Sequence, residues 1–283
     1  MKSKFYLTEC PRDAMQGIQN FIPTERKIEY INLLLGLGFD RLDFGSFVSS
    51  KAIPQLADTK QVISNLIHSE TSLLAIVANE RGASEACEFE RIDFLGYPFS
   101  INNTFQIRNT GKSIENSLPV LSKISETCSN KNKKLVIYLS MTFGNPYNEE
   151  YSLDQIFSTV QSISKNASHF EFMLSDTIGS SNKESIQKVY SEAVKSFPSI
   201  KWGLHLHSTA HEANEKIKAA IESGCTRFDS AFGGLGGCPM ASDSLTGNIP
   251  TEKLLPFIPE CSIDLSSENL QKIAHFNNLF NQN

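Results

Sequence analysis

The chain has 283 residues, of which 40% are hydrophobic and 20% are charged, and its formal net charge is −5. This composition supplies enough apolar side chains for a sizeable core and excludes a disordered chain. The negative charge and the lack of a basic cluster in the sequence argue against a nucleic-acid partner.

No stretch of the sequence approaches the roughly 20 consecutive apolar residues of a membrane helix, and Met1–Cys10 resembles neither a signal peptide nor a presequence. We therefore expect a cytoplasmic protein with no membrane partner. The cysteines lack C-x-x-C spacing, and a chain of this length does not need covalent staples. We expect reduced thiols at Cys10, Cys87, Cys128, Cys225, Cys238 and Cys261.

Short apolar, β-branched or aromatic runs recur along the chain and predict eight strands. Segments with helical spacing of apolar residues separate them. The predicted strands are Phe5–Thr8, Leu42–Phe47, Leu73–Val77, Ile92–Leu95, Leu135–Leu139, Phe170–Leu174, Trp202–Leu206 and Thr226–Asp229.

Capping signals mark where two of the predicted helices begin. In each, a serine is followed three residues later by glutamine or glutamate, the pattern of a capping box. The two pairs are Ser152 with Gln155 and Ser181 with Glu184.

Strict alternation of strands and helices implies a parallel sheet. Eight such units in fewer than 300 residues fit a closed (β/α)8 barrel, the TIM barrel of the α/β class, better than an open doubly wound sheet. Because no linker-like run divides the sequence, we expect a single domain covering residues 1–283. Residues 262–283 are expected to form a final helix, beginning near Ser266, that packs on the outside of the barrel.

Residues with chemical potential gather where the predicted strands end. Pro11–Asp13 follows the first strand, Asp176–Gly179 follows the sixth, His205–His207 closes the seventh, and a glycine-rich loop follows the eighth. The active site of a (β/α)8 enzyme is built on this face of the barrel. These segments are therefore the candidate site.

The pair His205 and His207 is the strongest single signal, because residues two apart on a strand project to the same side. Both can ligate a metal, or both can be polar residues satisfied by backbone groups. Asp13 beyond the first strand and Asn248 after the eighth strand favour the metal. Two imidazoles, a carboxylate and an amide oxygen suit octahedral Mg²⁺ or Mn²⁺ better than tetrahedral Zn²⁺.

Four glycines precede Cys238 in the loop after the eighth strand. Glycines allow a loop to move and its backbone to approach a ligand. We interpret Cys238 as a catalytic acid or base on a closing loop; the alternative is a tight turn with a buried thiol. Asp243 and Asn248 lie on the same stretch and can help to close the site.

Arg12 precedes Asp13 and is expected to face the same cavity, where a guanidinium can hold an oxyanion or an enolate. The alternative is a salt bridge to Asp43 or Asp229, and both roles can hold together. Asp176 is expected either to orient a metal ligand or to cap the following helix.

These motifs, in this order, resemble the 3-hydroxy-3-methylglutaryl-CoA lyase family. The resemblance runs through essentially the whole chain, and its most specific part is the Gly-Leu-Gly-Gly-Cys-Pro loop with the Gly-Asn that follows. The matching segments are Glu9–Gln16, Ser46–Ser49 with Pro54-Gln55, Ser175–Gly179, His205–His207, Gly234–Pro239 and Gly247-Asn248.

The resemblance implies a metal site, with Mg²⁺ or Mn²⁺ held by Asp13, His205, His207 and Asn248. It also implies cleavage of 3-hydroxy-3-methylglutaryl-CoA to acetyl-CoA and acetoacetate, a late step of leucine breakdown.

This chemistry assigns a role to each of the other residues. The metal would lower the pKa of the substrate hydroxyl, Arg12 would steady the enolate oxygen, and Cys238 would serve in proton transfer. His205 and Asp13 are both candidates for the base.

The sequence departs from the family pattern near the expected pocket. Asp43 stands where the family usually has glutamate, and Phe44 and Gly45 replace two threonines, which we expect to alter a wall or the floor of the pocket. Ser208–His211 replaces Asp-Thr-Tyr-Gly, and Met141–Tyr147 lacks the family's cysteines.

These departures leave two alternatives open. One is a related lyase or condensing enzyme that acts on a different 3-hydroxy-acyl-CoA or on a 2-oxo acid. The other is a barrel that binds a ligand without catalysis. For the CoA nucleotide the sequence offers only Lys51 and Arg81 as guesses, and a homodimer is expected for a metabolic enzyme of this size.

Overall fold

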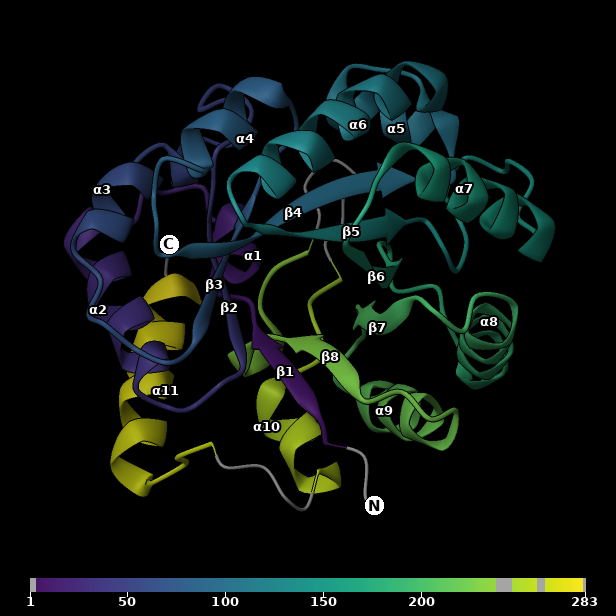
Figure 1. The fold of residues 1–283 in the computed structure, drawn as a ribbon. Coiled ribbons are helices and arrows are strands. Elements are labelled where there is room, and N and C mark those ends of the chain that lie inside the picture. Colours follow the sequence, from purple (N-terminus) through teal and green to yellow (C-terminus); the bar gives the residue numbers. More distant parts are fainter. Residues whose placement is uncertain (1–3, 238–245, 259–262, 282–283) are drawn as a thin grey trace.

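The computed structural model describes residues 4–237, 246–258 and 263–281. Eight parallel strands form a closed barrel in sequence order, with β8 paired to β1, as the (β/α)8 prediction requires (Figure 1). The strands are β1 (Tyr6–Glu9), β2 (Arg41–Ser46), β3 (Ser72–Ile76), β4 (Ile92–Ser100), β5 (Lys134–Ser140), β6 (Phe170–Asp176), β7 (Lys201–Leu206) and β8 (Arg227–Ser230).

Helices surround the barrel on all sides (Figure 1). None of those within the described ranges combines the length and apolar character needed to cross a bilayer. They are α1 (Pro11–Gln16), α2 (Thr24–Leu35), α3 (Thr59–Ser64), α4 (Glu80–Ala86), α5 (Asn103–Thr110), α6 (Ile114–Asn130), α7 (Leu153–Asn166), α8 (Lys183–Ser196), α9 (Ala213–Glu222), α10 (Thr251–Leu254) and α11 (Ser267–Asn281), with short 3₁₀ turns at Pro54–Leu56, Phe232–Gly234 and Leu255–Phe257.

The final helix packs outside the barrel as predicted. Ser266 Oγ accepts a hydrogen bond from the amide of Asn269, which fixes the start of α11. The ring of Tyr30 on α2 lies 5.2 Å from that of Phe276 and 5.1 Å from that of Phe280. Aromatic contacts of this kind attach α11 to α2.

Strand β4 extends five residues beyond Leu95, where the sequence analysis placed its end. The predicted end was wrong because Gly96 and Pro98 are residues that strands usually avoid. The structure explains Gly96. A Cβ at this position would lie 2.5 Å from Ile76 Cδ1 and 3.0 Å from Tyr138 Cε2. The missing side chain therefore leaves room for its neighbours inside the barrel.

The two capping boxes predicted from sequence are not formed as expected. Ser152 does cap α7, but the side chain of Gln155 donates to the carbonyl of Ile101 instead of reaching back. Helix α8 is capped one residue later, by a reciprocal box of Asn182 and Ser185. Ser181 is not free to cap, because its hydroxyl donates to Asp176.

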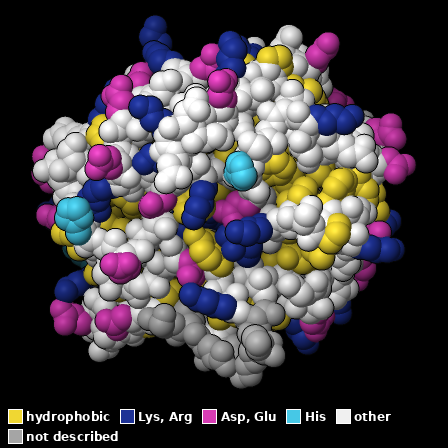
Figure 2. Space-filling view, viewed as in Figure 1, with side chains coloured by type: hydrophobic (Ala, Val, Ile, Leu, Met, Phe, Trp, Pro, Cys, Tyr) yellow, Lys and Arg dark blue, Asp and Glu magenta, His cyan; other side chains and the backbone are white. Residues whose placement is uncertain are grey.

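The barrel interior is layered along its axis. At the amino ends of the strands, Arg41 is fully buried, pairs with Glu171, and lies over the rings of Tyr6 and Phe94. Glu171 Oε2 also forms an ion pair with Arg227 Nη2 at 2.5 Å. Figure 2 shows basic, acidic and histidine side chains gathered around a hollow at the centre of this face.

A layer of buried apolar side chains lies above this charged cluster and separates it from the carboxyl ends of the strands. It consists of Leu74, Ile76, Phe94, Val136, Tyr138 and Met173. Outside the barrel, the larger apolar core fills the space between strands and helices. Of the cysteines, Cys10, Cys87, Cys128 and Cys225 are buried and free, as expected, whereas Cys238 and Cys261 lie outside the described residues.

The expectation that Phe44 and Gly45 shape the pocket is wrong. Neither lines the cavity described below, and Phe44 belongs to the outer apolar core. A Cβ at Gly45 would lie 2.7 Å from Thr59 Cγ2. The Thr59 hydroxyl is fixed there, since it accepts from the amide of Ser46 and donates to the carbonyl of Leu56. Gly45 is therefore matched to Thr59.

We predict that Gly45→Ala lowers the free energy of unfolding by about 1–3 kcal/mol, because the new methyl overpacks against Thr59. Thr59→Ser removes the obstructing methyl and keeps both hydrogen bonds. The double variant should recover most of the loss in urea denaturation, giving a clear coupling energy. Additive effects of the two changes would contradict this explanation.

Candidate active site

Four predicted metal ligands come together at the carboxyl ends of the strands. Asp13 lies in α1 directly after β1, and His205 and His207 lie at the end of β7. One possible ligand atom from each of these three lies within 4.8 Å of the others, and all three residues are buried. Asn248 joins them: it forms a β-bridge with His207, and its Nδ2 donates to Asp13 Oδ2 over 2.6 Å.

The Nε2 atoms of the two imidazoles face each other, and this arrangement is stable only with a positive charge between them. His205 Nδ1 lies 3.1 Å from a carboxylate oxygen of Asp229, and His207 Nδ1 lies 3.2 Å from the carbonyl of Thr177. Because both partners are acceptors, each Nδ1 carries the proton. The two unprotonated Nε2 atoms are then only 3.2 Å apart, and their lone pairs repel unless a cation or a proton lies between them.

The electrostatics of the two rings differ. Burial lowers the pKa of His207 to about 4, with the neighbouring His205 as the next cause. Burial also lowers the pKa of His205, but the hydrogen bond and the charge of Asp229 outweigh burial, so the pKa of His205 is raised. Of the two rings, His207 therefore binds a proton less readily.

Asn248 supplies a second sign that a cation fits here. Its Nδ2 is fully engaged, since it also donates to the carbonyl of Leu235 over 2.8 Å. Its Oδ1 is buried and has no hydrogen-bond partner among the described residues. An orphaned buried acceptor is costly. Together with two imidazole nitrogens and a carboxylate, this oxygen completes a donor set that suits Mg²⁺ or Mn²⁺.

Arg12 makes the salt bridge to Asp43 that the sequence left as an alternative. Its Nε and Nη2 bind the Asp43 carboxylate at 3.0 and 2.5 Å, while its Nη1 donates to Asp13 and Gln16 at 2.9 Å each. Arg12 also lines the cavity, so the structure is compatible with both roles. Although it is one methylene shorter than glutamate, Asp43 still reaches the guanidinium.

These contacts set the charge states of the acidic groups. Burial raises the pKa of Asp13, but Arg12 and the two histidines outweigh it and hold that pKa well below its ordinary value. For Asp43 burial dominates and the pKa is raised, although Arg12 opposes it. Asp13 is therefore an anion that is ready to bind a cation.

Of the two roles expected for Asp176, the cap of α8 is not formed, because Asn182 caps that helix. Its support of a metal ligand runs through Lys216, since it makes no described hydrogen bond with either imidazole. Instead it accepts from the amide and hydroxyl of Ser181 and from the buried Lys216 Nζ at 3.0 Å. Lys216 in turn donates to the carbonyl of His207 over 2.8 Å. Asp176 thus supports the site through Lys216.

Sequence reasoning missed Lys216, although a signal was present. Lys216 shares a helical stripe with the buried residues Ala213, Ile217 and Ala220. A lysine on the buried face of a helix is unusual and needs an anionic partner.

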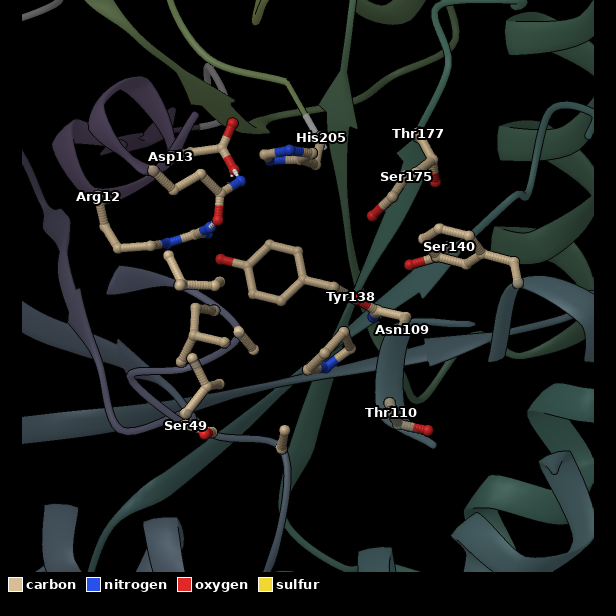
Figure 3. A pocket seen from close by; sticks show the side chains of 18 of the residues that line it. Arg12, Asp13, Ser49, Asn109, Thr110, Tyr138, Ser140, Ser175, Thr177 and His205 are labelled. Atoms are coloured by element: carbon tan, nitrogen blue, oxygen red, sulfur yellow. Dashed lines mark hydrogen bonds and ion pairs between the residues drawn. The ribbon is translucent and has the colours of Figure 1, made fainter. Parts of the chain in front are cut away.

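A cavity of about 380 Å³ opens beside the cluster. Figure 3 shows Arg12, Asp13 and His205 along one side of it, and Ser175 and Thr177 on the other. The lining also includes Tyr138, which the sequence analysis missed. Its buried Oη has no hydrogen-bond partner in the ranges that the structure describes. Its signal was the alternation along β5, which turns Val136, Tyr138 and Ser140 to the same face.

The described start of the glycine-rich loop packs directly on the cluster. Gly237 donates its amide to Asp13 Oδ2 over 3.3 Å. Gly236 has a φ of +100°, and a Cβ there would lie 2.6 Å from Asn248 Nδ2. Only glycine fits this approach. Cys238 and Asp243 lie outside the described residues, and neither Lys51 nor Arg81 lines the cavity, whereas Lys112 does.

The HMGL-like family model matches residues 5–279. The chain belongs to the HMGL-like family. It is similar to the hydroxymethylglutaryl-CoA lyase of Bacillus subtilis, with 32% identity over 89% of this chain and 84% of that protein. Its identity to the cytoplasmic 3-hydroxy-3-methylglutaryl-CoA lyase of Homo sapiens is 28%, over 93% of this chain and 70% of the human protein.

Solved structures of this family agree with the fold. An HMG-CoA lyase from A. baumannii, in complex with coenzyme A and 3-methylmalate, has a TM-score of 0.88 and 30% identity, covering 98% of this chain and 91% of that one. The HMG-CoA lyase from Brucella melitensis has a TM-score of 0.89 and 26% identity, covering 99% of both chains. The family expected from the sequence motifs is therefore confirmed.

We predict that Lys216→Met lowers the free energy of unfolding by about 3–5 kcal/mol, because it leaves the buried Asp176 carboxylate without its cation. The double variant Lys216→Met with Asp176→Asn removes both charges and should recover part of that loss. Urea denaturation of the three proteins measures the effect. If the single variant is as stable as wild type, the supporting role of the pair is wrong.

Proposed function

We propose that this protein is a divalent-metal-dependent lyase that cleaves 3-hydroxy-3-methylglutaryl-CoA to acetyl-CoA and acetoacetate. The observation that carries the proposal is the convergence of two unprotonated imidazole nitrogens, a carboxylate and an orphaned amide oxygen beside a cavity bordered by Arg12. The named relatives, with about 30% identity over most of the chain, support the same reaction.

The metal would be Mg²⁺ or Mn²⁺, held by Asp13, His205, His207 and Asn248. When bound, it would supply the Lewis acidity that makes the tertiary hydroxyl of the substrate a stronger acid. Asp229 and Thr177 orient the two imidazoles for this role by accepting their Nδ1 protons.

His205 and Asp13 are the two candidates for removing the hydroxyl proton. Asp13 already accepts hydrogen bonds from Arg12, Gln16 and Asn248. His205 directs Nδ1 to Asp229 and Nε2 toward the metal site, so as a metal ligand it has no second lone pair to offer. We therefore keep both as candidates for the base.

Carbon–carbon cleavage leaves negative charge on the thioester oxygen of the departing acetyl-CoA enolate. Arg12 borders the cavity with its guanidinium held rigidly by Asp43. A preorganised cation stabilises developing charge without having to rearrange. Cys238 is assigned the proton transfer to the enolate carbon.

A second candidate is a related lyase or condensing enzyme acting on a different 3-hydroxy-acyl-CoA or a 2-oxo acid. Ser208 favours it: it stands where the family usually has aspartate, and its buried Oγ has no hydrogen-bond partner within the described part of the chain. The third possibility, a binding barrel without catalysis, is disfavoured by the charged groups kept together at the cavity.

We also propose a role in leucine breakdown, a cytoplasmic location and a homodimer. Light scattering tests the homodimer.

The decisive assay is release of acetyl-CoA from 3-hydroxy-3-methylglutaryl-CoA by the purified protein, with Mg²⁺ or Mn²⁺ and again with a chelator. We expect turnover that the chelator abolishes and the metal restores. Calorimetric binding of Mn²⁺ without turnover would move the search to other acyl-CoA thioesters. Failure to bind Mn²⁺ would favour the non-catalytic barrel.

Variants of the ligands should separate metal binding from proton transfer. We expect Asp13→Ala and His207→Ala to weaken Mn²⁺ binding by more than about 100-fold, beyond the usual effect of outer-sphere changes, and to lose activity. Cys238→Ser should lower turnover by about 100-fold or more while leaving Mn²⁺ affinity nearly unchanged. Loss of metal in the Cys238→Ser protein would contradict the role assigned to the thiol.

A further inference from the structure

Glu9, the last residue of β1, is an acidic side chain that the proposed chemistry does not use. It is completely buried, and within the described ranges no basic side chain forms an ion pair with it. One carboxyl oxygen, Oε1, accepts a hydrogen bond from the amide of Phe232 over 2.8 Å. The other, Oε2, lies 2.5 Å from Thr251 Oγ1.

The two partners of Glu9 stand at opposite ends of one chain segment. Phe232 opens and Thr251 closes the stretch 232–251, which follows β8 and contains the glycine-rich loop and Asn248. Backbone bonds also join these ends, from the Ala231 amide to the Ile249 carbonyl at 3.1 Å and from the Thr251 amide to the Ala231 carbonyl at 3.2 Å. Glu9 therefore ties both ends of the segment to β1.

Two hydroxyls link Glu9 to Ser230. Thr251 Oγ1 lies within hydrogen-bond distance of Glu9 Oε2 and also 2.8 Å from Ser230 Oγ. Each hydroxyl has one proton to donate, so these contacts can be satisfied whether Glu9 is an acid or a carboxylate. Complete burial without a cation favours the acid, because an unpaired buried carboxylate is costly.

We propose that Glu9 is a positioning residue which, as a neutral carboxylic acid, joins the two ends of segment 232–251 and so holds Asn248 in place beside the metal ligands. The link to catalysis rests on the proposed function, but the link to metal binding and to stability does not.

The surroundings of Glu9 agree with a neutral state. Burial raises its pKa to about 8, more than the hydrogen bonds from Thr251 and Phe232 lower it. The titratable groups facing it are Glu252 on α10, Tyr30 on α2 and Cys10. Burial raises the pKa of both Tyr30 and Cys10. Ionised Glu9 would thus face Glu252 with no compensating cation.

The pKa of Glu9 determines the direction in which pH changes the stability of the fold. The folded pKa of Glu9 exceeds its ordinary value of 4.5. The stability contributed by the neutral acid is fully present below the unfolded pKa and is lost as the pH rises through about 8. Ionisation leaves a completely buried charge without a cation, so the contacts of Glu9 with both ends of the segment should loosen in alkaline solution.

Glu9→Gln tests this directly, because an amide keeps one acceptor for Phe232 and one donor for Thr251 but cannot ionise. We expect the melting temperature and the calorimetric Mg²⁺ affinity of wild type to fall between pH 7 and about 9, the affinity by roughly tenfold. In Glu9→Gln both should stay nearly flat. Glu9→Ala should bind Mg²⁺ weakly at every pH.

Glu252→Gln is the matched control, since Glu252 is exposed and contacts the same segment through the Gly233 amide at 3.1 Å. It should keep the wild-type pH dependence. Identical pH profiles for wild type and Glu9→Gln would overturn the proposal, as would wild-type Mg²⁺ affinity in Glu9→Ala. If Glu9→Gln fails to fold, Thr251→Val replaces it: weakened Mg²⁺ binding supports the proposal, and unchanged binding refutes it.

Discussion

Two imidazole nitrogens with lone pairs facing each other across 3.2 Å form the constraint on which the site depends. The arrangement is enforced from outside the pair, because Asp229 and Thr177 accept the Nδ1 protons and so direct both Nε2 atoms inward. Without a positive charge between them the rings would repel. The surrounding protein therefore holds in advance the geometry that a divalent cation requires, at a cost that binding the cation repays.

The charged groups around this pair carry an excess of negative charge, which a divalent cation would neutralise. Asp13 and Asp43 share the single guanidinium of Arg12, and Asp229 lies 3.1 Å from the imidazole of His205. The acidic groups thus exceed the permanent basic ones at the carboxyl end of the barrel. At the other end, Arg41 and Arg227 share Glu171 and give the opposite excess. An apolar layer keeps these two clusters apart, so each retains its own field.

Much of this could be predicted from sequence because the relevant signals are local. Alternating runs fix the number and order of strands, and the two-residue spacing of His205 and His207 places both rings on one face. Partners distant in sequence could not be predicted in this way. Nothing near Gly45 reveals Thr59, and nothing near Asp176 reveals that Lys216 lies 40 residues away beside it. The shift of the α8 cap to Asn182 has the same origin, since Ser181 is already engaged by Asp176.

Two hydrogen bonds at the carboxyl end of the barrel join residues that are far apart in the sequence. Asn248 is 235 residues from Asp13, and Thr251 is 242 residues from Glu9. During synthesis Glu9 and Asp13 leave the ribosome long before Asn248 and Thr251 have been made. A nascent chain can thus form most of its helices and strands while lacking a complete cation site, and only the arrival of the last strand and the segment after it assembles one. The ability to capture metal would then report that the barrel has closed and that Asn248 is in place.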